Sequence, residues 1–270
     1  FDTDGFTVGT NGGVNGSGDS YVGWQWKANG GTTSTNTDGD INSTVQVNST
    51  AGFSIITDSP ANNTARTIGH GLGAKPDFII RRARNRVEDW VVYHNAFEST
   101  LPGGWQGLNT DAAYNDSATT LFTSVSNTTF GVGTDFSVNG GYNYITYAFK
   151  EVQGYSKFGK YIGNGSTDGP FNYTGFKPAF IMLKQSSGSG NGWFVFDSKR
   201  DPNNSSTNKY LRVDESGAEG TTSKILDMYS NGFKIIHADS ATNGSNHTYI
   251  YMAFADNPFV TSTGIPTTAR

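Results

Sequence analysis

The sequence predicts an all-β protein, built as tandem antiparallel β-sandwich repeats of about 100 residues that are jelly-roll-like. Two observations carry this prediction. The chain repeats itself after 102 or 103 residues, and it consists of short strand-like runs separated by turn dipeptides such as Asn-Gly and Asp-Gly. The composition agrees, because 13% aromatic residues and 35 glycines accompany only 16% charged residues, as in a folded, turn-rich β protein.

The repeat appears as apolar and proline positions that recur in the same order. Pro76, Phe78, Trp90, Leu108 and Phe130 correspond to Pro178, Phe180, Trp193, Leu211 and Phe233. A period of this length favours two domain-sized units over a short-period solenoid, because each unit is long enough to bury its own core. We therefore expect a first complete sandwich over residues 52–153 and a second over residues 154–259.

The chain opens with the end of the same unit. Residues 21–27 match residues 144–150 and 249–255, which are the last strand-like runs of the two complete repeats. Residues 1–28 are therefore predicted to be the end of a preceding repeat or sandwich. An isolated hairpin is marginal in water. We expect this aromatic segment to pack on the first full repeat or to add to a neighbouring subunit by strand addition.

The remaining boundaries follow from local composition. Residues 29–51 are rich in Thr, Asn, Ser and Gly and nearly free of large apolar groups, which predicts a linker or an extended surface strand. Residues 260–270 are expected to be a C-terminal tail. The strand-like runs, rich in β-branched and aromatic residues, are residues 54–57, 77–80, 90–93, 144–149, 180–183, 193–196 and 249–254.

Charge and cysteine content exclude several function classes. The formal net charge is −4 and no long basic run is present, so we expect no nucleic-acid partner. No apolar run approaches the roughly 18 residues of a membrane span, so no membrane insertion is expected. The absence of cysteine excludes disulfides and thiolate metal sites.

No residue pattern predicts catalysis, a cofactor or a metal site. The four histidines lack the spacing of zinc ligands. Residues 36–40 begin like a calcium loop, but the twelfth position of that loop is Val47 and not glutamate. No two carboxylates stand out as a pair for glycoside hydrolysis. We therefore expect a protein that is not an enzyme.

The only basic cluster is a candidate receptor- or glycan-binding site. It consists of Arg81, Arg82, Arg84 and Arg86. The second copy replaces it by Lys184 and a neutral loop at residues 185–192. A difference between copies in a loop beside a strand favours a grafted binding function, such as contact with the acidic groups of a surface polysaccharide. The alternative is that these arginines form ion pairs with Glu88, Asp89 or a neighbouring subunit.

Trp105 is the second candidate contact. It lies in a turn-like sequence after Pro102-Gly103-Gly104, where an exposed indole could stack on a sugar ring. The alternative for Trp105 is packing in the core or in an interface, and the residue type alone does not separate the two.

Several strings within the repeats resemble a known group of proteins. Residues 52–56, 68–80 and 90–94, and in the second copy residues 154–159, 174–180 and 251–259, are similar to repeats in tail-fibre and other virion structural proteins of marine and environmental bacteriophages. The resemblance spans nearly the whole chain. It implies a non-enzymatic, extracellular virion protein, such as a tail fibre or surface appendage. It also implies a homo-oligomer, with a trimer favoured, that contacts other virion proteins and recognises a host-surface polysaccharide or protein.

The residues alone are also compatible with four other functions. They are a carbohydrate-binding module of a larger secreted bacterial protein, a capsid decoration or fibre protein, a polysaccharide depolymerase, and a self-assembling filament subunit in which the opening segment docks into the next copy.

Overall fold

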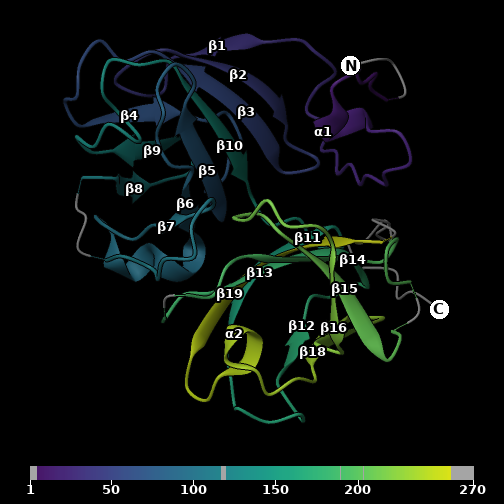
Figure 1. Cartoon of the computed structure of the whole chain (residues 1–270). Helices are drawn as coiled ribbons and strands as arrows, with labels where there is room; N and C mark the ends of the chain where they lie inside the picture. Colours follow the sequence, from purple (N-terminus) through teal and green to yellow (C-terminus); the bar gives the residue numbers. More distant parts are fainter. Residues whose placement is uncertain (1–4, 117–119, 189, 203, 257–270) are drawn as a thin grey trace.

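The chain folds into two β-sandwich units that lie side by side, with the opening segment beside both (Figure 1). The computed structural model describes residues 5–116, 120–188, 190–202 and 204–256. All strand ladders in these residues are antiparallel. The predicted all-β fold of two sandwich repeats is therefore confirmed.

The first unit pairs a large sheet with a small one. In spatial order, the large sheet contains β1 (Ser34–Asn36), β2 (Ser43–Asn48), β3 (Phe53–Asp58), β10 (Tyr144–Phe149), β5 (Phe78–Ala83), β6 (Val91–His94) and β7 (Gln106–Gly107). The small sheet contains β4 (Arg66–Gly69), β9 (Thr129–Val132) and β8 (Phe122–Val125). A 3-10 helix, η1 (Asn95–Thr100), follows β6.

The second unit repeats this plan. Its large sheet has the order β11 (Ser156–Ile162), β19 (Thr248–Ala255), β13 (Pro178–Gln185), β14 (Phe194–Asp197), β15 (Thr207–Arg212) and β16 (Gly220–Ser223). Its small sheet contains β12 (Phe171–Tyr173), β18 (Gly232–Ile235) and β17 (Leu226–Tyr229). The helices α1 (Gly12–Asn15) and α2 (Ser240–Asn243) have four residues each. In the part of the chain that the structure describes, no helix has the length and apolar character needed to cross a bilayer.

Strand alternation builds the core of each sandwich. In β10 the side chains of Tyr144, Thr146 and Ala148 are buried, while Ile145 and Tyr147 between them are half-buried. This period of two points one set of side chains towards the small sheet and the other set away from it. The inner cores follow from it, with Ile79 and Phe130 in the first unit and Leu183 and Phe233 in the second.

A third apolar cluster joins the two units. It includes Phe78 and Phe149 of the first unit and Phe158, Phe180 and Phe254 of the second, all less than 10% exposed. The ring centroids of Phe78 and Phe158 are 5.9 Å apart, and those of Phe149 and Phe254 are 6.0 Å apart. The two sandwiches therefore share a buried aromatic core and form one body.

Of the two alternatives predicted for residues 29–51, a linker or an extended surface strand, the structure shows strands. This segment contains β1 and β2, and β2 pairs with β3 along five residues. Its sequence carries few large apolar groups because only one side of β2 faces the core. Ser43 and Val45 point inwards there and are buried. The first unit therefore begins at β1, before residue 52.

The opening segment packs in cis, which is one of the two arrangements that the sequence predicts. Residues 5–28 contain no strand, so the segment contacts the body through side chains and does not extend a sheet. Trp26 contacts the rings of Phe149, Phe180 and Phe254 at 5.3–6.1 Å, and Trp24 contacts Phe180 at 5.5 Å. Trp26 therefore closes the aromatic core that the two units share.

Replacing Trp26 by alanine is expected to lower the free energy of unfolding by about 2 kcal/mol, because the indole is half-buried among three rings and the cavity left behind cannot collapse fully. Chemical denaturation followed by intrinsic fluorescence measures the change. Val14→Ala in the same segment is the matched control, because Val14 is 51% exposed and should change stability by less than about 0.5 kcal/mol. Equal stability of the two variants would contradict the packing of the segment in cis.

Candidate binding face on the first sheet

The two large sheets share the same pairing pattern over five strands, β3-β10-β5-β6-β7 and β11-β19-β13-β14-β15, so the residues of these strands can be matched one to one. Phe78 pairs with Phe149 and His94 in the first unit, as Phe180 pairs with Phe254 and Asp197 in the second. The side of the first sheet that points away from its own core, here called the open face, consists of Ile80, Arg82, Trp90, Ile145 and Tyr147. The corresponding residues of the second sheet are Met182, Lys184, Trp193, Ile250 and Met252. The five residues of the open face are half-buried, whereas all five counterparts are at most 5% exposed.

The centre of the open face is an aromatic pair with a cation on it. The rings of Trp90 and Tyr147 stack with centroids 6.4 Å apart and planes inclined by 22°. The guanidinium carbon of Arg82 lies 5.2 Å from the centroid of Trp90. Among the described residues no acceptor lies within hydrogen-bonding distance of Arg82 Nε, although that nitrogen is buried. A buried donor without an acceptor costs free energy. A partner that supplied an acceptor for Arg82 Nε would remove this cost.

Two of the predicted arginines lie at the edge of the open face. Arg84 follows β5 and is exposed. Arg86 donates hydrogen bonds of 2.5 Å to Glu88 Oε1 and to the hydroxyl of Tyr142, and its guanidinium also lies over the ring of Tyr142. The ion pair with Glu88 is the alternative that the sequence left open. Arg86 is thus held in place by its partners, whereas Arg84 is an exposed cation of the same group.

Arg81 does not belong to this surface. Its side chain is completely buried on the inner side of β5, where Nη1 and Nη2 donate to the two carboxylate oxygens of Asp58 at 2.7 Å. Nη1 also donates to Thr146 Oγ1 at 2.7 Å, and Nε donates to the Val138 carbonyl at 2.8 Å. Because neighbouring residues of a strand point to opposite faces, Arg81 and Arg82 separate completely, and Arg81 is a core residue that no receptor can reach.

Trp105 also lies apart from the open face. It is half-buried against the inner core of the first sandwich, and its backbone pairs with Asn115 in both directions at 3.0–3.1 Å. Its Nε1 is buried without an acceptor among the described residues. The structure therefore places Trp105 in the packing role that the sequence left as its alternative, and does not bring it together with Arg82, Arg84 and Arg86.

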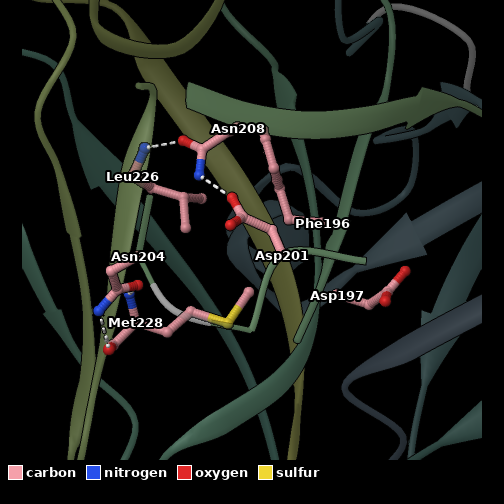
Figure 2. Close-up of a pocket in the computed structure, with 7 residues that line it drawn as sticks. All are labelled: Phe196, Asp197, Asp201, Asn204, Asn208, Leu226 and Met228. Atoms are coloured by element: carbon pink, nitrogen blue, oxygen red, sulfur yellow. Dashed lines mark hydrogen bonds between the residues drawn. The ribbon is translucent and has the colours of Figure 1, made fainter. Parts of the chain in front are cut away.

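The second unit contains a small cavity whose Asp201 and Asn204 side chains already bond other residues. The cavity, with a volume of about 210 Å³, is lined by Lys177, Ser198, Asp201, Pro202, Asn204 and Met228. Figure 2 shows the adjoining residues: Asn208 accepts from the Leu226 amide and donates to Asp201, and Asn204 bonds the backbone of Met228. These bonds hold the loop between β14 and β15 against β17. The cavity is smaller than the usual range for small-molecule sites, about 300–1,000 Å³.

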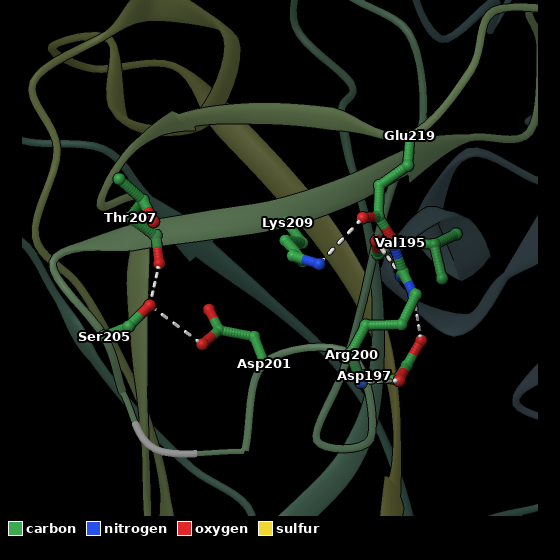
Figure 3. A network of polar contacts seen from close by, with 8 residues as sticks. All are labelled: Val195, Asp197, Arg200, Asp201, Ser205, Thr207, Lys209 and Glu219. Carbon is green, nitrogen blue, oxygen red and sulfur yellow. Dashed lines mark hydrogen bonds and ion pairs between the residues drawn. The ribbon is translucent and has the colours of Figure 1, made fainter. Parts of the chain in front are cut away.

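A polar network next to this cavity fixes another loop. Figure 3 shows Arg200 between Asp197, the Val195 carbonyl and Glu219, with Nε 2.6 Å from Asp197 Oδ2 and Nη1 3.2 Å from Glu219 Oε2. Lys209 Nζ lies 3.2 Å from the other oxygen of Glu219. The network therefore anchors the end of the segment that joins β15 to β16, at residues 213–219.

The histidines serve as backbone caps in the first unit. His70 and His94 are fully buried, and each accepts a backbone N–H at Nδ1 while Nε2 donates to a carbonyl. Burial lowers the pKa of both, that of His94 to about 4. Among the described residues, no three His, Asp or Glu side chains are placed to hold a metal ion.

The sequence did not single out Trp90 and Tyr147, which form the centre of the open face. Trp90 is matched by Trp193, and a residue that recurs in both copies indicates scaffold more than a binding site. The signal that could have found the pair is the alternation in β10, in which Ile145 and Tyr147 lie on the side opposite to the core residues.

Comparison with known proteins adds a family but no function. The sequence pattern of one family, described as a domain of unknown function (DUF7483), matches residues 1–258. No curated protein matches the chain, and no solved structure matches it.

Proposed function

Since the chain belongs to the DUF7483 family, whose description names no activity, we propose from the molecule itself that it is a non-enzymatic structural protein of a bacteriophage virion. In this proposal it is part of a tail fibre or another extracellular surface appendage and works as a homo-oligomer. The strings of sequence that resemble phage fibre repeats support the virion location. The supporting structural observation is the single body made of two repeats, held together by a shared aromatic core.

A rigid body of tandem sandwiches suits an appendage that holds a binding surface at a fixed place and catalyses no reaction. Each unit buries its own inner core, and the interface between the units is as apolar and as well buried as those cores. Interfaces of this kind do not act as hinges, because separation of the units would expose the aromatic side chains to water. The half-buried open face is then a surface that can contact another molecule.

Immunogold electron microscopy of virions tests this function. Antibodies against the purified protein are expected to label intact particles of a phage that encodes the chain, at the tail tip or along surface fibres. Antibodies pre-absorbed with the same protein are the control. Absence of label on intact particles, together with recovery of the protein only from the particle-free fraction of the lysate, would overturn the virion location.

A second candidate function uses the same open face. The stacked Trp90 and Tyr147 with the cation of Arg82 offer a flat aromatic surface of the kind that packs against a sugar ring. Arg84 beside them is an accessible partner for an acidic group of a polysaccharide.

A further inference from the structure

The open face of the first unit has a covered counterpart in the second unit, and the cover is known. Residues 106–114 of the first unit lie on the counterpart: Trp193 Nε1 donates to the Gly107 carbonyl at 2.7 Å, and Lys184 Nζ donates to the Asp111 carbonyl at 3.0 Å. The amide of Tyr114 also donates to the Ser186 carbonyl at 2.9 Å. These contacts leave Lys184 completely buried and Trp193 1% exposed.

Among the described residues, no segment covers the open face in this way, although the face carries the same kinds of groups. Trp90 corresponds to Trp193, and Arg82 corresponds to Lys184. Lys184 has two carbonyl acceptors, from Asp111 and Asn191, whereas Arg82 Nε is buried without an acceptor among the described residues. A segment that bound this face as residues 106–114 bind the second unit would supply the missing acceptor.

The second unit has its own copy of the covering segment, and most of that copy is exposed in the part of the chain that the structure describes. Gln106 lies opposite Val92 in the first unit, as Leu211 lies opposite Val195 in the second. The strand pairing therefore makes Gln106 the counterpart of Leu211, two residues before Leu108, which the sequence repeat matches to it. With this register, residues 106–114 correspond to residues 211–219. Val213 is 39% exposed there, and residues 215–219 are also exposed.

Contacts within the second unit hold both ends of this segment in a fixed conformation. Asp214 accepts a hydrogen bond of 2.7 Å from the Trp193 amide at one end, and Glu219 is held by Arg200 and Lys209 at the other (Figure 3). Anchoring at both ends lowers the entropy lost when a loop binds. Only the residues between the anchors remain available to a partner.

The charges of the two surfaces are complementary. The open face and its edge carry Arg82 and Arg84, while the residues between the two anchors of the segment carry the carboxylate of Glu215. The side chain of Glu215 is 56% exposed and makes only a 3.6 Å pair with Arg212. Opposite charges at the rim guide association and fix its register.

We propose that the open face of the first unit binds the segment at residues 213–219 of a second copy of this chain. The contact repeats between molecules the arrangement that already joins the two units within one molecule. It is a head-to-tail interface, since two different surfaces meet, and such interfaces form rings or filaments according to their rotation. The inference deepens the oligomeric part of the proposed function, and its failure would leave the virion location untouched.

Cysteine cross-linking tests the proposal directly, because the native chain has no cysteine. Tyr114 lies at Ser186 within the molecule, so the matching positions between molecules are Arg84 and residues 218–219. The variants Arg84→Cys and Ala218→Cys are purified separately, mixed and oxidised. A cross-linked heterodimer is expected, whereas Arg84→Cys mixed with Glu98→Cys, an exposed site outside the proposed contact, should remain monomeric in a denaturing gel.

Sedimentation measurements over a range of concentrations supply the second readout. Arg82→Glu and Glu215→Arg are each expected to weaken self-association about tenfold or more, and an equimolar mixture of the two should associate again. Circular dichroism verifies that both variants are folded, and Glu215→Arg lies on an exposed loop. Three results would overturn the proposal: a wild-type monomer at all concentrations, cross-linking of Arg84→Cys only to itself, or a monomer whose Trp90 fluorescence is quenched by a surface polysaccharide.

Discussion

Replacing Arg81 by leucine is expected to lower the free energy of unfolding by about 3–5 kcal/mol, because it leaves the Asp58 carboxylate buried without its partner. Both side chains are completely buried, and the guanidinium makes two bonds to the carboxylate. Arg81 also satisfies the Val138 carbonyl and the Thr146 hydroxyl. Chemical denaturation of the purified variant measures the loss. Arg84→Leu, at an exposed position of the same arginine run, should change stability by less than about 0.5 kcal/mol.

The second unit shows how this loss can be reversed. By strand pairing, Leu183 and Tyr161 occupy the places of Arg81 and Asp58. The fold therefore accepts an uncharged pair at this position, in which the Tyr161 hydroxyl donates to the Thr242 carbonyl. The double variant Arg81→Leu/Asp58→Leu is expected to regain most of the stability, to within about 2 kcal/mol of the native chain, because no buried charge remains unpaired. A double variant no more stable than Arg81→Leu would show that the pair is not coupled as described.

The arginine run illustrates where prediction from sequence stops. A cluster of four basic residues is visible in the sequence, but its division between two faces depends on which side of β5 points inwards. Phe78 and Ile79, which precede the cluster, are both apolar and both buried. The side facing the core therefore has no sequence signature at this point. Asp58, the partner of Arg81, is 23 residues away and becomes its neighbour only through sheet pairing.

The repeat, by contrast, predicted the architecture well because it is a property of order along the chain. Matched positions such as Phe78 and Phe180 gave two sandwiches, and these lie at equivalent places in the two large sheets. The open face could not be predicted, because matched residues such as Trp90 and Trp193 differ only in what covers them. Coverage is decided by the packing of one unit on the other, which leaves no periodic signal in the sequence.

Acidification from pH 6.5 to pH 4 is expected to destabilise the protein through His94. Burial in the contact between the units, and secondarily the charge of Lys160, lowers the pKa of His94 to about 4. The unfolded chain, in which the pKa of histidine is about 6.5, therefore binds more protons than the native state in this window. The contribution of His94 to the free energy of unfolding is fully present above pH 6.5. It is lost as the pH falls towards 4, which lowers the stability by about 3 kcal/mol.

The geometry explains why His94 does not accept the proton. Nδ1 accepts the Ala96 amide at 3.0 Å, and Nε2 donates to the Tyr251 carbonyl of the second unit at 3.2 Å. A proton on Nδ1 would break the first bond and leave a charge in the aromatic core. At the matching position Asp197 caps Lys199 in the same way with a carboxylate oxygen, so a side-chain oxygen can replace Nδ1.

The variant His94→Asn isolates this effect. Its amide oxygen can still accept from Ala96, but it has no proton to bind between pH 4 and pH 6.5, so denaturation at a series of pH values should give a shallower loss of stability than in the native chain. The carboxylates and His70, whose pKa is also lowered by burial, titrate in both proteins and cancel in the difference. Parallel curves for the two proteins would contradict the assignment to His94. A curve that converges with the native one near pH 4 would locate the acid-sensitive contact between the two sandwiches at His94 and Tyr251.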